Sequence, residues 1–174
     1  MWSVQKGLRL LLMSILIGPL AAVTSQAAPL DQPNGDVLLT VTGAIEHTNA
    51  PGQARFDRAM LEAMPQHSFD TTTPWTEGKH QYQGVLLKEL LQQLGAKGSK
   101  VVAHALNDYH SVIDLEPIRD YPVMIAIRAD GRPMRVRDKG PLWILYPMSD
   151  YPELDHQRHH PAMVWQLNRL EVQP

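Results

Sequence analysis

Three short segments of the sequence bring aromatic and polar side chains together where a strand is expected to end or a tight turn to begin. The segments are 71–76, which contains Trp75 in a threonine-rich loop, 105–109, which contains Asn107, Asp108 and Tyr109, and 139–143, in which Gly140 separates Lys139 from Trp143. Each segment alone is weak evidence, since Asn-Asp at a turn usually only forms the turn. Together they offer stacking faces and a few hydrogen-bonding groups, which predicts a pocket for a planar heterocycle.

A second candidate site is the histidine-rich segment 155–160. His156, His159 and His160 follow Asp155 closely. Imidazole nitrogens near a carboxylate suit zinc or copper, but this spacing matches no common metal site. Because prolines bound the segment, we expect a polar loop here, with a metal site as the alternative.

Positive charge gathers between residues 128 and 139, and two interpretations of it stay open. Such a stretch usually forms exposed surface, but arginine side chains also suit carboxylate and phosphate ligands. The residues concerned are Arg128, Arg132, Arg135, Arg137 and Lys139.

Several classes of chemistry are excluded by residues and motifs that the sequence lacks. It contains no cysteine, which excludes disulfides, thiolate metal ligands and cysteine nucleophiles. GxSxG, HExxH, P-loop and GxGxxG motifs are also absent, so the commonest hydrolase, zinc protease and nucleotide-binding sites are not expected. The net charge of −2 gives no reason to expect nucleic-acid binding.

The first residues have the pattern of an export signal. Lys6 and Arg9 precede an apolar stretch at 10–23, and small residues follow at 25–28. This order predicts a secretory signal peptide at 1–27. The alternative is a membrane anchor, but fourteen residues with a Gly-Pro break are short for a bilayer span. We therefore expect a periplasmic protein without membrane insertion after cleavage, with a flexible leader at 28–36 and one domain at 37–174.

Short strands with few helices are expected to position these residues. The strands are expected at 37–43, 68–72, 101–106, 111–115, 123–128, 142–146 and 164–172. One helix is expected at 58–64, capped by Asp57, and a leucine-rich one at 85–94, ended by Gly95. Since the elements do not alternate as βαβ units, the predicted class is α+β, with a mixed, partly barrel-like sheet and a few short helices.

Five segments resemble the molybdopterin-binding fold of sulfite-oxidase-type enzymes. They are Thr-Val-Thr-Gly at 40–43, the segment 71–75, Tyr-Gln-Gly-Val-Leu-Leu at 82–87, Ala-Leu-Asn-Asp-Tyr at 105–109 and Arg-Asp-Lys-Gly-Pro-Leu-Trp at 137–143. The end of the chain, 164–172, is similar to the last strand of that fold. The resemblance covers about residues 37–172.

One departure from that family affects the expected function. In the enzymes, a cysteine on the strand before the tryptophan holds molybdenum, and the matching place here is about Thr71. A threonine hydroxyl is too weakly acidic to replace a thiolate. The sequence is therefore similar to small, cysteine-free, periplasmic pterin-binding proteins of the same fold.

This resemblance implies a ligand sensor rather than an enzyme. We expect the domain to bind a pterin, without molybdenum, and to serve the periplasmic sensor domain of an inner-membrane signalling protein, either one controlling cyclic-di-GMP or a sensor kinase. Two alternatives stay open: a molybdenum-cofactor oxidoreductase that lacks the cysteine ligand, and a periplasmic adaptor module without a ligand.

The edge of a pterin suggests how the predicted pocket would recognise it. That edge presents two adjacent N–H donors and a carbonyl, and the two oxygens of a carboxylate, here Asp108, match the paired donors. The alternative is that Asp108 only stabilises its own turn. Trp75 or Trp143 would stack on the rings, and Arg137 and Lys139 would donate to the carbonyl. The predicted ligand-binding residues are Thr71, Trp75, Asn107, Asp108, Tyr109, Arg137, Lys139, Gly140 and Trp143.

Overall fold

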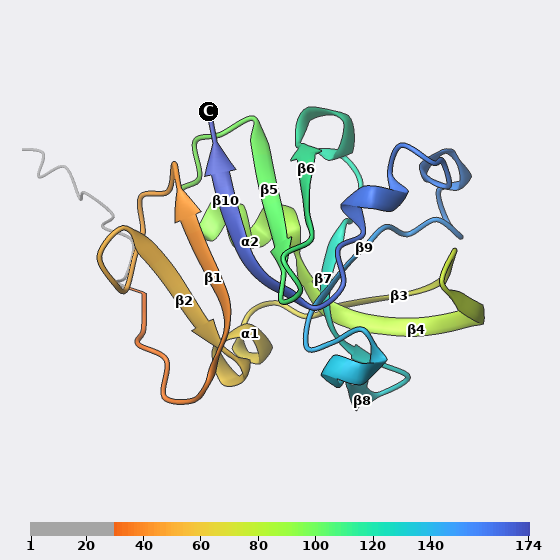
Figure 1. Ribbon diagram of the computed structural model, residues 1–174, viewed down its shortest axis with the longest axis horizontal. Coiled ribbons are helices and arrows are strands. Elements are labelled where there is room, and N and C mark those ends of the chain that lie inside the picture. The colour runs from red at the N-terminus through yellow and green to blue at the C-terminus, as the bar shows by residue number, and fades with distance from the viewer. Residues whose placement is uncertain (1–29) are drawn as a thin grey trace, which may run out of the picture.

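The computed structural model describes residues 30–174, which form two small sheets, two α-helices and several 3-10 turns (Figure 1). The predicted signal peptide lies outside the described residues. The strands are β1 (Val37–Gly43), β2 (Gln53–Asp57), β3 (His67–Thr73), β4 (Thr76–Leu86), β5 (Lys100–Ala105), β6 (His110–Asp114), β7 (Met124–Ala129), β8 (Arg132–Pro133), β9 (Trp143–Leu145) and β10 (Leu167–Gln173). The helices are α1 (Arg58–Ala63) and α2 (Leu87–Gln93), and the 3-10 turns are Glu116–Ile118, Val136–Asp138, Pro152–Leu154 and His160–Ala162.

The strands divide between two sheets. The first has the order β2-β1-β10-β5-β6, and its β1–β10 pair is parallel while its other pairs are antiparallel. The second has the order β3-β4-β7-β8, with β9 paired to β7. This mixed arrangement with few helices confirms the predicted α+β class.

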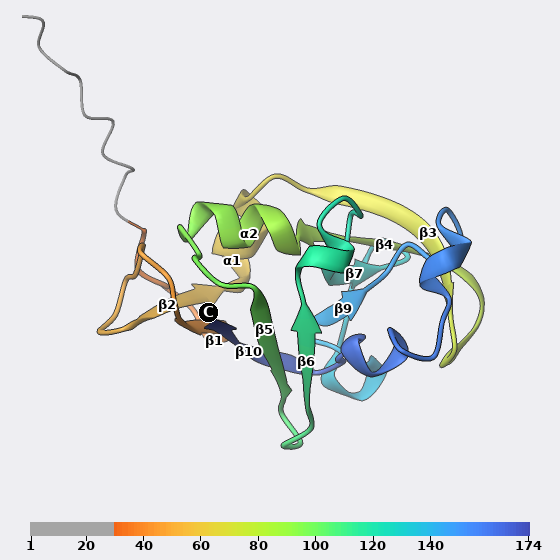
Figure 2. The ribbon, with the colours of Figure 1, turned by 90° about the horizontal axis from the view of Figure 1, so that it is seen from above.

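The core lies where both helices and the second sheet meet one face of the first sheet (Figure 2). Leu39 and Leu170 from the first sheet, Leu90 from α2 and Ile125 from β7 are all completely or almost completely buried there. Within residues 30–174, none of the helices has the length and apolar character that crossing a membrane requires.

The start of α1 is held by the predicted cap. Asp57 is buried, and its Oδ1 accepts a hydrogen bond from the Met60 backbone N–H at 2.9 Å. Its Oδ2 accepts from the backbone N–H groups of Asn34 and Gly35 at 2.7 and 2.8 Å. These donors, Met60 first, lower the pKa of Asp57. The leader is therefore attached to the domain at Asn34 and Gly35, while the flexibility of 28–36 stays a prediction.

The predicted helix at 85–94 is wrong at its start, because Val85 and Leu86 belong to β4 and α2 begins two residues later, at Leu87. Strand pairing with β7 decides this boundary. Gly84 allows it, since a Cβ on this residue would come within 2.1 Å of the Ile125 carbonyl oxygen. The apolar residues that predict the helix are buried in either conformation, so their spacing does not mark where the strand ends.

The end of α2 is as predicted. Gly95 has a φ of +59°, which favours glycine, and its N–H donates to the Gln92 carbonyl at 3.0 Å. The Ala96 N–H donates to the Leu91 carbonyl at 2.9 Å, which closes the last turn.

The remaining differences are strand boundaries. The strands β2, β4 and β8 are absent from the prediction, because their polar residues do not form a strong apolar pattern. The last strand begins at Leu167 rather than Val164. Trp165 leaves the sheet to form an isolated bridge with Trp143, and Gln166 turns the chain with a φ of +52°.

Candidate functional site

A cavity of about 200 Å³ lies where three loops meet: the β3–β4 turn, the β5–β6 turn and the segment before β10. Its lining is largely aromatic and apolar. The lining residues are Trp75, Asn107, Tyr109, His160, Pro161, Met163, Val164 and Trp165. Three of these residues, Trp75, Asn107 and Tyr109, are among those predicted from the sequence.

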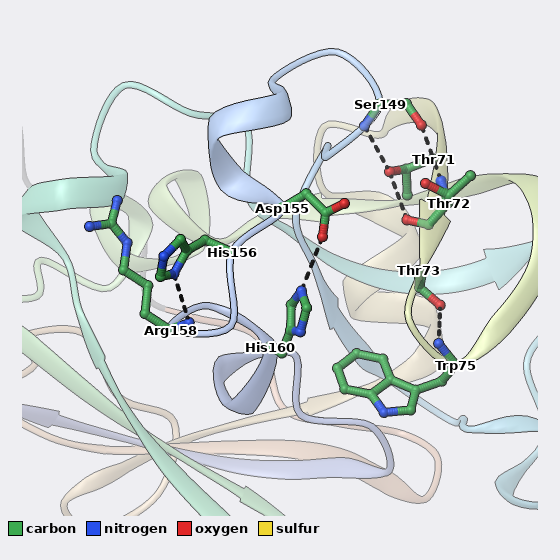
Figure 3. Close-up of polar contacts among 9 residues, drawn as sticks. All are labelled: Thr71, Thr72, Thr73, Trp75, Ser149, Asp155, His156, Arg158 and His160. Atoms are coloured by element: carbon green, nitrogen blue, oxygen red, sulfur yellow. Dashed lines mark hydrogen bonds and ion pairs between the residues drawn. The ribbon is translucent and has the colours of Figure 1, made fainter.

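Trp75 is oriented by threonines of its own turn (Figure 3). Its backbone N–H donates to the Thr73 hydroxyl at 3.2 Å, and the hydroxyls of Thr73 and Thr76 are 2.8 Å apart. The threonine-rich sequence around the tryptophan therefore builds a turn that holds the indole against the cavity.

Three of the aromatic rings that line the cavity pack against one another. The Trp75 and Trp165 ring centroids are 5.1 Å apart, with the planes at 75°, and His160 lies 5.9 Å from Trp75 at 70°. Neither of these indole N–H groups has a hydrogen-bond partner within residues 30–174. By contrast, the Trp143 indole donates to the Met163 carbonyl at 3.0 Å.

Trp143 belongs to the core below the cavity. It is only 1% exposed, packs edge-on against Tyr82 at 5.7 Å and lies 6.3 Å from Trp75. Its rings are therefore covered by protein groups, and it supports Trp75 from beneath instead of lining the cavity. Its predicted stacking on a ligand stays a prediction that the cavity lining does not favour.

Lys139 places a positive charge beside the aromatic walls. Its Nζ is 5.7 Å from the Trp165 ring centroid and 5.9 Å from that of Trp143. This geometry is that of a cation–π interaction. The loop is fixed from both sides, because the Lys139 carbonyl accepts from the Gln166 N–H at 2.9 Å and a Cβ at Gly140 would lie 2.5 Å from the Met134 backbone. Lys139 and Gly140 therefore stand next to the cavity, as part of its support.

Arg137, in contrast, points into solvent. Its side chain is 72% exposed, and its Nε is 3.9 Å from Asp138 Oδ1. The structure does not bring it to the cavity lining.

The three predicted residues of the β5–β6 turn differ in whether they line the cavity. Asn107 and Tyr109 line the cavity, and the Tyr109 hydroxyl donates to the Pro161 carbonyl at 3.0 Å, which ties this turn to the segment before β10. Asp108 is exposed and outside the lining. Its φ of +64° is one that Asp and Asn tolerate, which fits the alternative that it stabilises the turn. Its role towards a ligand stays a prediction.

Thr71 is completely buried in β3 and does not open onto the cavity lining. Its hydroxyl donates to the Thr72 carbonyl at 3.1 Å and accepts from the Ser149 N–H at 3.3 Å. The Thr72 N–H donates in turn to the Ser149 hydroxyl at 3.1 Å, so that β3 is joined to the loop after β9. This position holds a satisfied hydroxyl where a thiolate ligand would be required. The chain, which has no cysteine, does not fit thiolate-bound molybdenum.

The three histidines of the 155–160 segment point in different directions. His156 Nδ1 accepts from the Arg158 N–H at 3.1 Å, and His159 is buried. His160 Nε2 is 3.1 Å from Asp155 Oδ1, and the ring lies between Asp155 and Trp75 in Figure 3. Among residues 30–174 no three potential ligands gather as a metal site would require.

Five lining residues are absent from the predicted set, and His160 and Trp165 are the aromatic ones among them. The sequence predicts Trp165 as part of the last strand, but in the structure it directly precedes the turn residue Gln166. A tryptophan just outside a strand is the signal already used for Trp75, and it would have found Trp165. No such signal exists for His160, whose place depends on how the 150–163 loop folds back onto Trp75.

Comparisons with known proteins agree with this architecture. The family model described as "Oxidoreductase molybdopterin binding domain" matches residues 39–149. Among solved structures, the chain is similar to the sulfane dehydrogenase SoxCD from Paracoccus pantotrophus, with a TM-score of 0.59 and 19% identity. That match covers 83% of this chain and 40% of the other, so the chain spans well under half of that protein and the likeness concerns the fold alone. No curated protein matched the sequence.

Proposed function

The chain belongs to the oxidoreductase molybdopterin-binding domain family, and from this premise we propose that the cavity bordered by Trp75 and Trp165 binds the ring system of a pterin. The main support is the cavity itself, whose two indoles stand 5.1 Å apart and nearly perpendicular. One indole can then stack on a planar ring while the other contacts its edge. A largely apolar cavity with few polar groups is the usual design for such a ligand.

Polar groups around the rings support the same ligand. The free indole N–H groups of Trp75 and Trp165 and the Lys139 ammonium group supply donors for a ring carbonyl. The Asn107 amide oxygen supplies an acceptor for the amino edge, although it also accepts a 3.4 Å hydrogen bond from the Tyr109 N–H. These groups would orient a bound pterin, and the indole faces would exclude water from its rings.

The test is a titration of purified protein with oxidised and reduced pterins, followed by ligand fluorescence. We expect saturable binding that Trp75→Ala weakens strongly and Trp75→Phe weakens less, since phenylalanine keeps an aromatic face. Equal binding by wild-type protein and both variants would contradict the proposal.

An oxidoreductase that holds a molybdenum cofactor is the second candidate function. The family favours an oxidoreductase-like module over a signalling sensor. The donor set argues against a thiolate-bound metal, because Thr71 is buried and hydrogen-bonded. Elemental analysis of purified protein distinguishes the candidates: one molybdenum per chain that survives dialysis supports the oxidoreductase.

We also propose that the protein is exported to the periplasm and passes pterin status to the periplasmic sensor domain of an inner-membrane signalling protein. The signal-peptide pattern and the missing thiolate support this role. The exposed turn around Arg132 and the 150–160 loop are the candidate contact surfaces. Cell fractionation tests the location, and cyclic-di-GMP levels in cells carrying Trp75→Ala test the role. If a deletion of the gene leaves those levels unchanged, a sensor kinase remains as the partner to be assayed.

A further inference from the structure

A second cavity, of about 300 Å³, lies on the other side of the 150–163 loop, between that loop, β6 and the Glu116–Ile118 turn. Most of its wall is apolar. Its lining residues are Val112, Ile113, Asp114, Pro117, Ile118, Tyr146, Arg158, His159 and Ala162. None of them lines the first cavity, and Figure 3 shows Arg158 extending away from His160 and Trp75.

Tyr146 contributes a buried hydroxyl to this cavity. The residue is only 1% exposed, and its hydroxyl has no hydrogen-bond partner within residues 30–174. Within residues 30–174, the side-chain atoms that are inaccessible and also lack a hydrogen-bond partner are Arg58 Nη1 and His104 Nε2. The Tyr146 hydroxyl is not among them although it has no partner, so it is accessible from the cavity. Burial raises the pKa of Tyr146, which keeps the phenol protonated and able to donate.

Arg158 is exposed and contributes a cation whose Nε is held in place. Its Nε donates to Nε2 of the buried His159 at 3.0 Å, and the His159 ring lies 5.4 Å from the Tyr146 ring at 33°. Because Nε2 accepts this hydrogen bond, the proton of a neutral His159 is on Nδ1. The terminal N–H groups of Arg158 have no carboxylate within ion-pair distance in the described chain. The Asp114 carboxylate at the rim is 3.7 Å from Lys100 Nζ, which offsets its charge.

Tyr146 and Arg158 thus present donors at this cavity. Asp114, with Lys100 as its partner, and His159 also line it, and the rest of the wall is apolar. We propose that the cavity is a second binding site, for a small organic carboxylate whose oxygens accept hydrogen bonds from Tyr146 and Arg158. The apolar part of the ligand lies against Ile113 and Ile118. A donor-only pair suits an anion, and the guanidinium group gives the charge-assisted hydrogen bond. This site does not depend on the function proposed for the first cavity.

The experiment is a calorimetric and NMR titration of purified protein with acetate, butyrate, hexanoate and inorganic phosphate. We expect affinity to rise about fourfold for each methylene group that becomes buried. Arg158→Gln weakens hexanoate binding at least about tenfold, and Tyr146→Phe weakens it about five- to tenfold. Amide shifts appear at Ile113 and Ile118. Arg119→Gln, an exposed arginine beside the same turn, is the matched control and leaves affinity unchanged.

Tyr146→Phe separates binding from structure. Because the hydroxyl has no protein partner, its removal leaves the melting temperature of the empty protein unchanged or slightly higher. A lower melting temperature together with unchanged hexanoate affinity would show a structural hydroxyl and overturn the proposal. Absence of carboxylate binding at millimolar concentration, or phosphate binding as tight as that of hexanoate, would also overturn it.

Discussion

His159 and His160 are neighbours in the chain, yet they face two different cavities. His160 stands against Trp75 and is paired with Asp155, while His159 is buried against Tyr146 and accepts from Arg158. The first cavity has mainly aromatic walls, and the second has an apolar wall with two directed donors. One loop thus supplies side chains to two sites of different chemistry.

The difference comes from the local backbone. The 3-10 turn His160–Ala162 begins directly after His159, and in such a turn successive side chains point about 120° apart. The side chains of these adjacent residues therefore point in different directions, and one of them lines each cavity. A ligand in either cavity contacts the loop that also borders the other one.

The largest expected effect is a loss of ligand binding in the first cavity that leaves binding in the second cavity unchanged. Trp75→Ala removes a stacking wall, and we expect pterin affinity to fall about 5- to 150-fold, while hexanoate affinity stays the same. Fluorescence titration measures the first and calorimetry the second. Equal losses of both affinities would show that the two cavities are not separate sites.

Charge at the edge of the first cavity should matter less. Lys139→Gln removes the cation near Trp165, and we expect pterin affinity to fall about 2- to 13-fold, in line with the loss of one hydrogen bond to the ring carbonyl of about 0.5–1.5 kcal/mol. Lys79→Gln, an exposed lysine on β4, is the control that should have no effect. If Lys139→Gln and Lys79→Gln bind the pterin with equal affinity, Lys139 does not contact the ligand and only stabilises its own loop.

The buried His159 makes the stability of the fold sensitive to acid. Burial lowers the pKa of His159 from its ordinary 6.5, and the nearby positive charge of Arg158 lowers it further. Below pH 6.5 the unfolded chain binds a proton that the folded chain does not, so stability falls as the pH drops towards the lowered value. We expect the melting temperature of His159→Gln to decline less than that of wild type between pH 7 and 5 (about the range in which histidine titrates).

His80 is the control of opposite sign. The hydrogen bond that His80 donates to the Asp130 carboxylate raises the pKa of His80, so its contribution to stability is present in acid and is lost as the pH rises through the raised value. His80→Gln should therefore lower the melting temperature at pH 5 more than at pH 8 (a range of about three units around neutrality). The same pH profile for His159→Gln and His80→Gln would contradict both assignments. Burial also lowers the pKa of His104, which is present in the wild type and in both variants and therefore contributes equally to all three pH profiles.

The smallest expected effect is that of Asp108→Asn. Since Asp108 lies outside the cavity lining and asparagine also adopts positive φ, we expect pterin affinity to change by no more than about twofold. The melting temperature should also stay the same. A tenfold or larger loss of affinity would instead establish Asp108 as the carboxylate that reads the amino edge of the ring.

The sequence predicts the fold class, both helices and part of the first cavity. The cap at Asp57 and the terminator at Gly95 are local features, set by a side-chain oxygen and by a φ that glycine prefers. Trp75 and Tyr109 are found because they flank strand ends. Such features need only a few neighbouring residues to be recognised.

What the sequence does not predict depends on contacts distant in the chain. The boundary between β4 and α2 is decided by pairing with β7, about 40 residues further on. His160 and Tyr146 gain their places only when the 150–163 loop folds over the strands, and no local pattern indicates that path. The polar partner strands β2 and β4 are recognisable only beside the strands they complete.

The place of β10 in the first sheet constrains the order in which the protein assembles. β10 is the last element in the chain, yet it lies between β1 and β5. Until it has been synthesised, the β1–β2 and β5–β6 hairpins are separate ribbons, each with an open edge, and isolated hairpins are at best marginally stable. The nascent chain therefore lacks a complete first sheet until its C-terminal strand is available. A chain shortened before Leu167 would leave both edges exposed to aggregation.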